Sequence, residues 1–291
     1  MIRIEREWLS QVATNYLVRL KEFAKKNPRT TVGKIFKASP NEEEFDQLIL
    51  CPPEKLQSYP SPTWIGSDKF VTAYRCFFGT EGSDKVNNAL WFVQQLNIPV
   101  CPYCNRTYMF SVSHRPGKAK RNVRPELDHF FPKKTAKYSH LAISFYNLVP
   151  SCPQCNQLKG NTVFDYHPYF GSLKNSGDPS LKVSNAQIDN GEYLFPDNPI
   201  IGIENPNENT KTLALQELYA QHTDFVKEIM DKIQAYNADL YEPLISSFQG
   251  LSKTPEEIDR LIWGVYIDDE KQIKRPLSKL TIDILKQFDV L

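Results

Sequence analysis

Two short cysteine motifs decide the expected fold, since residues 101–104 read CPYC and residues 152–155 read CPQC. Two thiolates separated by two residues can both bind one Zn²⁺ ion at about 2.3 Å, and a second pair completes a tetrahedral site. We therefore predict a closed structural zinc site made by Cys101, Cys104, Cys152 and Cys155. Another metal or a redox pair is the alternative, although prolines at the same internal position of both motifs argue against redox chemistry.

The interval between the motifs is longer than in a minimal zinc ribbon and leaves room for an inserted hairpin. Residues 107–112 (TYMFSV) have the composition of a strand. After the turn-like RPGK, residues 123–129 are expected to return as the second strand, carrying Asp128 and His129. The sequence NQLKG after Cys155 predicts a short helix that ends at Gly160.

Charge is concentrated in the same interval. The chain as a whole has a net charge of +1, but residues 101–160 contain ten Lys or Arg against two acids, a local charge of +8 that leaves −7 elsewhere. A basic run is usually a solvated face. Because this one coincides with both cysteine motifs, we favour a site for an anionic polymer.

The flanks are expected to be mainly helical and to carry no chemistry. Apolar residues recur at three- and four-residue steps in residues 8–23, and a second helix is expected over residues 85–96. The proline-rich residues 52–62 predict an ordered loop. Beyond the motifs, residues 171–205 predict irregular β structure or connecting loops, residues from about 211 a long apolar helical stripe, and residues 277–288 a last helix.

The expected organisation is therefore an α+β chain, mostly helical, with a helical region over residues 1–100, a core over 101–170 and a C-terminal region over 171–291. An apolar fraction of 41% is ample for a real core. The chain has no run of about 18 apolar residues, and its start, MIRIEREWLS, is charged, so we expect a cytoplasmic protein without membrane segments. In that reducing compartment cysteine pairs bind metal, and Cys51 and Cys76 are expected as buried small hydrophobes.

Polar residues between the motifs complete a recognisable order. Residues 127–134 read LDHFFPKK, residues 146–156 read YNLVPSCPQCN, and Lys159 follows. This order resembles the zinc-stapled HNH endonucleases, whose catalytic core is a ββα-metal motif. The resemblance covers roughly residues 101–168, about a quarter of the chain. Asn156 stands where that family has its final histidine, which makes this an HNN variant.

The resemblance implies roles for individual residues. His129 would be the general base that takes a proton from the attacking water, and an imidazole suits this because it titrates near neutral pH. Asp128 and Asn156 would hold a catalytic Mg²⁺ or Mn²⁺ ion through oxygen atoms. Asn147 would bridge the loop and orient His129. Nearby lysines would contact phosphates of DNA with little sequence preference: Lys133, Lys134, Lys137 and Lys159.

Three functions are weighed. The first is a divalent-metal-dependent DNA endonuclease, similar to HNH effectors of bacterial anti-phage defence of the Septu and retron-associated kind, which act beside an ATPase. The chain has no Walker A sequence, so such control would come from a partner. The second is a non-catalytic zinc-ribbon module that binds nucleic acid or protein. The third is RNA cleavage.

The remaining histidines are expected to be less important. His167 is a candidate to line the site, with a packed surface histidine as the alternative. His114 and His140 are expected at the surface, and His222 as an ordinary helical residue. Asn156 could equally cap the short helix after the second cysteine motif.

Overall fold

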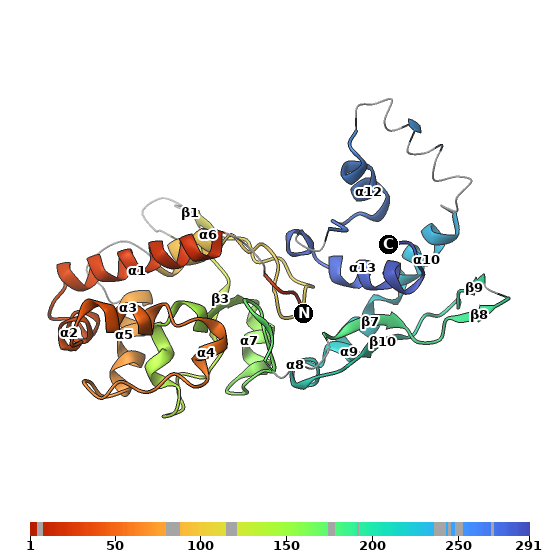
Figure 1. Cartoon of the computed structure of the whole chain (residues 1–291). Coiled ribbons are helices and arrows are strands. Elements are labelled where there is room, and N and C mark those ends of the chain that lie inside the picture. The colour runs from red at the N-terminus through yellow and green to blue at the C-terminus, as the bar shows by residue number, and fades with distance from the viewer. Residues whose placement is uncertain are drawn as a thin grey trace.

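Helices and small antiparallel sheets make up the chain. The structure, a computed structural model, describes residues 1–4, 8–79, 88–114, 121–173, 178–190, 192–235, 243, 246–247, 253–268 and 271–291. Within these residues every sheet has two antiparallel strands. Figure 1 shows the N-terminal helices on one side, strands β7 to β10 with the last helices on the other, and β3 and α7 between them.

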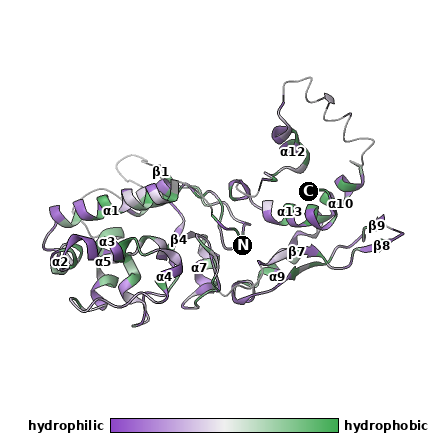
Figure 2. Cartoon of the chain, viewed as in Figure 1, coloured by the Kyte–Doolittle hydropathy of each residue, from purple (hydrophilic) through white to green (hydrophobic). Residues whose placement is uncertain are grey.

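The described residues of the N-terminal region contain six helices: α1 (Trp8–Lys26), α2 (Thr31–Ala38), α3 (Glu42–Ile49), α4 (Pro53–Leu56), α5 (Asp68–Phe78) and α6 (Asn88–Leu96). Hydrophobic and hydrophilic residues are interspersed along α1 (Figure 2), as expected of a helix with one buried face. The two helices expected here are confirmed where they are described, and residues 85–87 lie outside the described residues. The loop expected at residues 52–62 instead contains α4, which begins at a proline that suits a first helical turn.

An aromatic cluster joins these helices to the central segment. The Tyr16 ring on α1 packs against Phe77, Phe92 and Phe145, and its hydroxyl donates to the Ile143 carbonyl at 2.9 Å. Ile143 belongs to the 3₁₀ helix η1 (Ser139–Ile143), and Phe145 begins η2 (Phe145–Asn147). The N-terminal helices therefore support the loop that lies between the two cysteine motifs.

The central strands pair differently from the expectation. Strand β1 (Val112–His114) pairs with β2 (Arg121–Val123), whereas β3 (Glu126–His129) pairs with β4 (Leu148–Ser151). The prediction that Asp128 and His129 lie on the returning strand of the first hairpin was wrong. Pro125 has no N–H to donate to a ladder and separates β2 from β3. The predicted RPGK turn lies outside the described residues.

Helix α7 (Pro153–Lys159) follows β4 and confirms the short helix expected after the second cysteine motif. Its C-cap Gly160 has φ 53°, a left-handed value that glycine adopts without the strain of a side chain. At the other end, the Cys152 side chain caps the helix, so Asn156 does not.

The C-terminal region begins with short strands: β5 (Tyr166–His167), β6 (Gly171–Ser172), β7 (Ser180–Val183), β8 (Gln187–Asp189), β9 (Glu192–Leu194) and β10 (Ile201–Glu204). The helices that follow are α8 (Glu208–Thr212), α9 (Leu215–Tyr219), η3 (Ala220–His222), α10 (Thr223–Ala235), α12 (Pro255–Trp263), η4 (Gln272–Lys274) and α13 (Ser278–Gln287). The last helix is confirmed. The long helical stripe is interrupted at Ala214, whose φ is 48°.

Both ends of the chain contact the first cysteine motif. The Tyr219 hydroxyl donates to the Cys104 carbonyl at 2.6 Å, and the Leu277 N–H donates to the Asn105 carbonyl at 2.7 Å. From the N-terminal segment, the Ile2 N–H donates to the Pro102 carbonyl at 2.9 Å. The motif is therefore held from two sides. Across the described residues, none of the helices combines the length and apolarity that crossing a bilayer requires.

Candidate metal centre and active site

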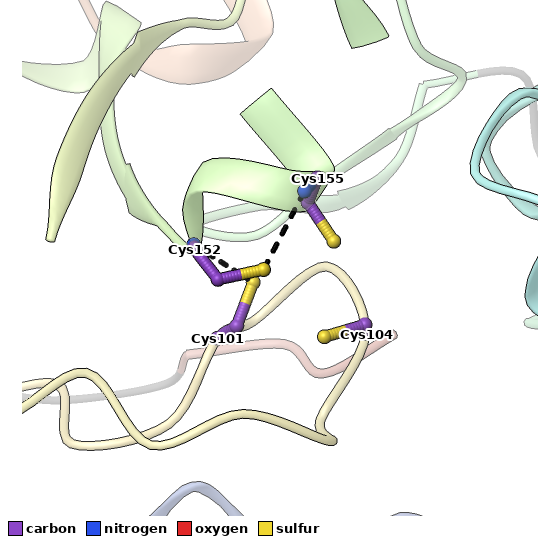
Figure 3. Close-up of side chains that lie close together, drawn as sticks. All are labelled: Cys101, Cys104, Cys152 and Cys155. Carbon is purple, nitrogen blue, oxygen red and sulfur yellow. Dashed lines mark hydrogen bonds between the residues drawn. The ribbon is translucent and has the colours of Figure 1, made fainter. Parts of the chain in front are cut away.

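Four cysteines form one buried cluster. The sulfurs of Cys101, Cys104, Cys152 and Cys155 all lie within 4.8 Å of one another, and each residue is at most 2% exposed. Figure 3 shows two of them on the loop before β1 and two at the start of α7, with the sulfurs turned toward one another. The spacing of the two motifs therefore predicted which residues meet.

Backbone groups shape both halves of this cluster. In the first motif Asn105 has φ 48°, a left-handed conformation that asparagine tolerates, and its N–H donates to the Cys101 carbonyl. In the second, the Cys155 N–H donates to the Cys152 sulfur at 3.5 Å, and the Cys152 N–H donates to the Cys101 sulfur at 3.4 Å (Figure 3). Such N–H groups stabilise negative charge on sulfur.

The cluster fits a structural metal such as zinc. In a structural four-cysteine site, zinc is bound by four converging sulfurs at about 2.3 Å and has no open coordination position. Burial raises the pKa of the Cys101 thiol, and contacts with Cys101 raise that of Cys155, so four buried sulfurs do not ionise together unaided. A doubly charged ion would stabilise the negative charge on the sulfurs and allow them to ionise together. Zinc would be held by these four side chains and would supply cohesion between the motifs.

Strands β3 and β4 and helix α7 form a compact unit directly beside the cysteine cluster. In the ladder Asp128 lies opposite Val149, and His129 lies opposite Leu148 at the end of β3. Because side chains alternate along a strand, Glu126 and Asp128 share one face while His129 takes the other. Helix α7 contacts β3. In chain order these three elements are a strand, a strand and a helix.

The His129 ring is held in one tautomer. Its Nε2 lies 3.1 Å from the Ala142 carbonyl oxygen, which can only accept, so Nε2 carries the hydrogen. Burial lowers the pKa of His129 well below its usual value, and Lys133 adds to the effect. The neutral ring therefore keeps a lone pair on Nδ1. This is the protonation state that a general base requires.

Two side chains cover that ring. Tyr74 on α5 packs edge-on against His129 with ring centres 4.4 Å apart, and the Lys133 ammonium lies 3.9 Å from the Tyr74 ring centre. The same ammonium lies 3.3 Å from Nδ1 of His129 and donates to its lone pair. Burial, with a smaller contribution from Arg75, lowers the pKa of Lys133 to about 8. His129 is only 6% exposed beneath this cover.

Asn147 ties the loop between β3 and β4 to itself. Its side-chain oxygen accepts from the Phe131 N–H at 2.7 Å, and its amide donates to the carbonyls of Phe131 and Leu141 at 3.1 and 3.0 Å. Leu141 is next to Ala142, whose carbonyl holds His129. These contacts make Asn147 a positioning residue for the loop, while its effect on catalysis stays a prediction.

Asp128 is engaged by two buried groups. The Lys159 ammonium lies 3.2 and 3.1 Å from its two carboxylate oxygens, and the Tyr103 hydroxyl donates to Oδ2 at 2.6 Å. Lys159 also donates to the His129 carbonyl at 2.8 Å. Burial raises the pKa of Asp128 and lowers that of Lys159, and their attraction opposes both shifts. Each charge is thus compensated by the other.

The expected pair of magnesium ligands is not open in this arrangement. The Asn156 amide donates to the Glu126 carboxylate, and Asp128 is occupied by Lys159 and Tyr103. For Asp128 and Asn156 to share one divalent ion, both would have to exchange these partners. The two side chains as they lie do not fit a catalytic ion.

The candidate phosphate-binding lysines divide into two groups. Lys134 and Lys137 are exposed, and Lys133 is half-buried over Tyr74. Lys159 is 1% exposed, so the prediction that it follows phosphates at the surface was wrong. Its ammonium is turned inward because a buried carboxylate, Asp128, requires a cation there.

His167, considered both as a residue lining the site and as a packed surface histidine, is buried, and so is His140. The Nε2 of His167 pairs with the Tyr146 carbonyl at 3.0 Å, and its Nδ1 accepts from the Tyr169 N–H. His140 is 1% exposed and bonds the Tyr59 carbonyl, so its expected surface position was wrong.

His222 lies in η3, where it accepts from the Arg106 side chain at 3.0 Å, and the His114 side chain lies outside the described residues. Cys51 is buried as expected, whereas Cys76 is only partly buried.

Sequence reasoning missed the residues that contact the motif from elsewhere. Tyr74 and the Ala142 carbonyl carry no local signal, because only the packing of α5 along η1 brings them to His129. Tyr103 lies inside the first cysteine motif, and its position between two zinc ligands could have suggested a contact with the core. Comparison with known proteins adds nothing here, since no family model, curated protein or solved structure matches the chain.

Proposed function

We propose that this protein is an endonuclease that hydrolyses phosphodiester bonds of DNA, with His129 as the general base. One observation carries the proposal: the Nε2–H of His129 donates to the Ala142 carbonyl, which leaves a lone pair on Nδ1 of a neutral ring. The ring ends a strand of a β3–β4–α7 unit that is closed by four convergent cysteines. Ten basic residues in residues 101–160 suit a polyanion.

In the proposed hydrolysis, the proton moves from the attacking water to His129. A water oxygen forms a bond to phosphorus, and Nδ1 of His129 takes the water proton. The bond from phosphorus to the 3′-oxygen breaks, its electron pair stays on that oxygen, and the leaving 3′-oxygen takes a proton from solvent water. In the resting protein Lys133 donates to that lone pair. An approaching phosphate offers the ammonium a charged acceptor in place of a neutral one, which frees Nδ1 as substrate binds. Exposed Lys134 and Lys137 are suited to adjacent phosphates.

A catalytic Mg²⁺ or Mn²⁺ ion belongs to this proposal by resemblance alone. When bound, such an ion neutralises charge on the non-bridging oxygens of phosphate. Asp128 and Asn156 are its expected ligands, and both have other partners here. The requirement for a divalent ion is therefore a separate question for the assay.

A non-catalytic zinc module that binds nucleic acid or protein is the second candidate. It is favoured by the near-complete burial of His129 and by the Lys159 ion pair on Asp128, both of which are also features of an inert core. The two candidates share bound zinc and salt-sensitive DNA binding. They differ only in turnover.

The test is incubation of the zinc-loaded protein with supercoiled plasmid in Mg²⁺, in Mn²⁺ and without either, followed by gel analysis for nicked and linear DNA. The nuclease proposal predicts cleavage, and a matched RNA substrate separates DNA from RNA hydrolysis. Cytoplasmic anti-phage defence is part of the proposal, so the assay is repeated with an ATPase encoded beside the gene. Absence of cleavage under all these conditions would favour the zinc module.

A further inference from the structure

A cavity of about 300 Å³ lies between the end of α6 and the segment that leads into β1, away from His129. Its floor is apolar, from Val93, Ile98, Pro99 and Met109, and Phe110 forms a wall. The Met109 N–H donates to the Pro99 carbonyl at 2.7 Å, which fixes the two segments side by side. In Figure 1, α6 and β1 are neighbours at this point.

Polar and aromatic groups at the rim have the character of a site for a flat heterocycle. Gln94 and Asn97 line the cavity and are exposed, so each presents an amide that can both donate and accept. The rings of Phe110 and Tyr108 are stacked with centres 4.7 Å apart, yet they are 60% and 47% exposed. Within the part of the chain that the structure describes, these two rings are largely exposed and offer a stacking surface.

The charge of the adjoining sequence favours a nucleic acid over an apolar protein partner. Residues 101–125 contain no Asp or Glu and six basic residues, of which Arg115, Lys118 and Lys120 lie outside the described residues: Arg106, Arg115, Lys118, Lys120, Arg121 and Arg124. An apolar protein partner would not require this positive charge. A nucleobase within DNA is part of a chain of negatively charged phosphates, which the positive charge would attract. Aromatic faces within a positive segment are the usual means of binding unpaired nucleotides.

We infer that this cavity, with the Phe110 and Tyr108 stack, binds an unpaired nucleobase of the DNA substrate. The base stacks on Phe110 above the apolar floor, and its edge meets the amides of Gln94 and Asn97. The inference rests on the proposed function for its choice of polymer and narrows the substrate to DNA with a single-stranded segment.

The spacing along the chain agrees with that substrate. Val112 lines the cavity and pairs with Val123 on β2. His129 follows Val123 by six residues along the chain. At about 3.3 Å per residue the two lie no more than about 20 Å apart. That distance corresponds to about six stacked nucleotides at about 3.4 Å each.

The test measures binding without cleavage. Fluorescence anisotropy, without added Mg²⁺ or Mn²⁺, compares a single-stranded oligonucleotide of about 12 nucleotides with the same sequence as a blunt duplex. The variant Phe110→Ala should weaken single-strand binding about 5- to 100-fold and leave duplex binding unchanged. Phe110→Tyr, which keeps the ring, should bind as the unmodified protein does, and Gln94→Met should weaken binding to some bases more than others.

The matched control is Ile188→Ala, which removes another exposed apolar side chain, on β8, and should bind both DNAs normally. Equal zinc content and unfolding midpoints show that the variants are folded. If Phe110→Ala binds the single strand as tightly as the unmodified protein does, the inference is overturned. The stack of Phe110 and Tyr108 would then be a candidate surface for a protein partner instead. Binding is measured without turnover, so the two proposals can fail separately. Phe110-dependent binding of single-stranded DNA without any cleavage would contradict only the nuclease proposal. Cleavage without such binding would contradict only this inference.

Discussion

The substitution Lys159→Met tests the most unusual feature of the core, a buried ion pair beneath the candidate active site. Lys159 is 1% exposed and Asp128 3% exposed, and the ammonium contacts both carboxylate oxygens and the His129 carbonyl. Methionine fills a similar volume, so the change removes a charge without opening a large cavity.

The expected loss of unfolding free energy in Lys159→Met depends on the contacts that Asp128 keeps. A buried charge that loses its partner typically destabilises a protein by about 3–5 kcal/mol. The Tyr103 hydroxyl still donates to Oδ2 at 2.6 Å, which places the expected value near the lower end, about 3 kcal/mol. Asp128→Asn, which leaves the ammonium unpaired, should cost a similar amount, and the double variant should cost clearly less than the two together.

Urea unfolding of the four zinc-loaded proteins provides the coupling free energy. We expect about 2 kcal/mol or more between Lys159 and Asp128, within the range for contacting residues. A loss below about 1 kcal/mol for Lys159→Met, with coupling near zero, would show that this pair behaves like an exposed ion pair. Lys159→Met also removes the ammonium that occupies the Asp128 carboxylate. If Asp128 is a metal ligand, Mn²⁺ should therefore raise the melting temperature of Lys159→Met more than that of the unmodified protein.

Three further outcomes are expected. Asn147→Ala removes three buried hydrogen bonds and should lower the free energy of unfolding by about 2–4 kcal/mol, and a loss below about 1 kcal/mol in urea would contradict its bridging role. Burial lowers the pKa of His167 to about 3 from 6.5, so this residue stabilises the fold above pH 6.5 and the contribution declines as the pH falls toward 3. Replacing it by Gln should therefore reduce the loss of stability between pH 7 and pH 5 by about 2 kcal/mol, and equal pH dependence would contradict its buried, neutral state. Stripping zinc with a chelator should abolish cooperative unfolding, since structural zinc contributes about 10–16 kcal/mol. Metal analysis should find zinc in Cys51→Ser but not in Cys155→Ser, and zinc retained by Cys155→Ser would argue against the four-cysteine site.

Local patterns in the sequence predicted the parts of the structure that depend on near neighbours. The two-residue spacing of the cysteines and their shared prolines led to the correct four residues, and Gly160 marked the end of α7. The apolar stripes identified α1 and α13. Each of these signals is local in the sequence: a pair of cysteines separated by two residues, a glycine at a helix end, or an apolar stripe along a single helix.

What the sequence did not reveal depends on distant contacts. The interruption at Pro125 gives β3 a different partner, and that partner follows a loop closed by Asn147. Lys159 looked like one more surface lysine, because nothing local shows that Asp128 will be buried beside it. Tyr74 precedes His129 by 55 positions in the chain, and only tertiary packing brings the two rings together.

The central claim is that a neutral imidazole, aimed by a backbone carbonyl, removes a proton from water during phosphodiester hydrolysis. The most direct measurement is the initial rate of plasmid cleavage by His129→Ala beside a matched histidine variant, His222→Ala, at equal zinc content. We expect His129→Ala to be at least about 100-fold slower, the usual contribution of a general base, and His222→Ala to cleave normally. Equal rates for His129→Ala and the unmodified protein would contradict the claim.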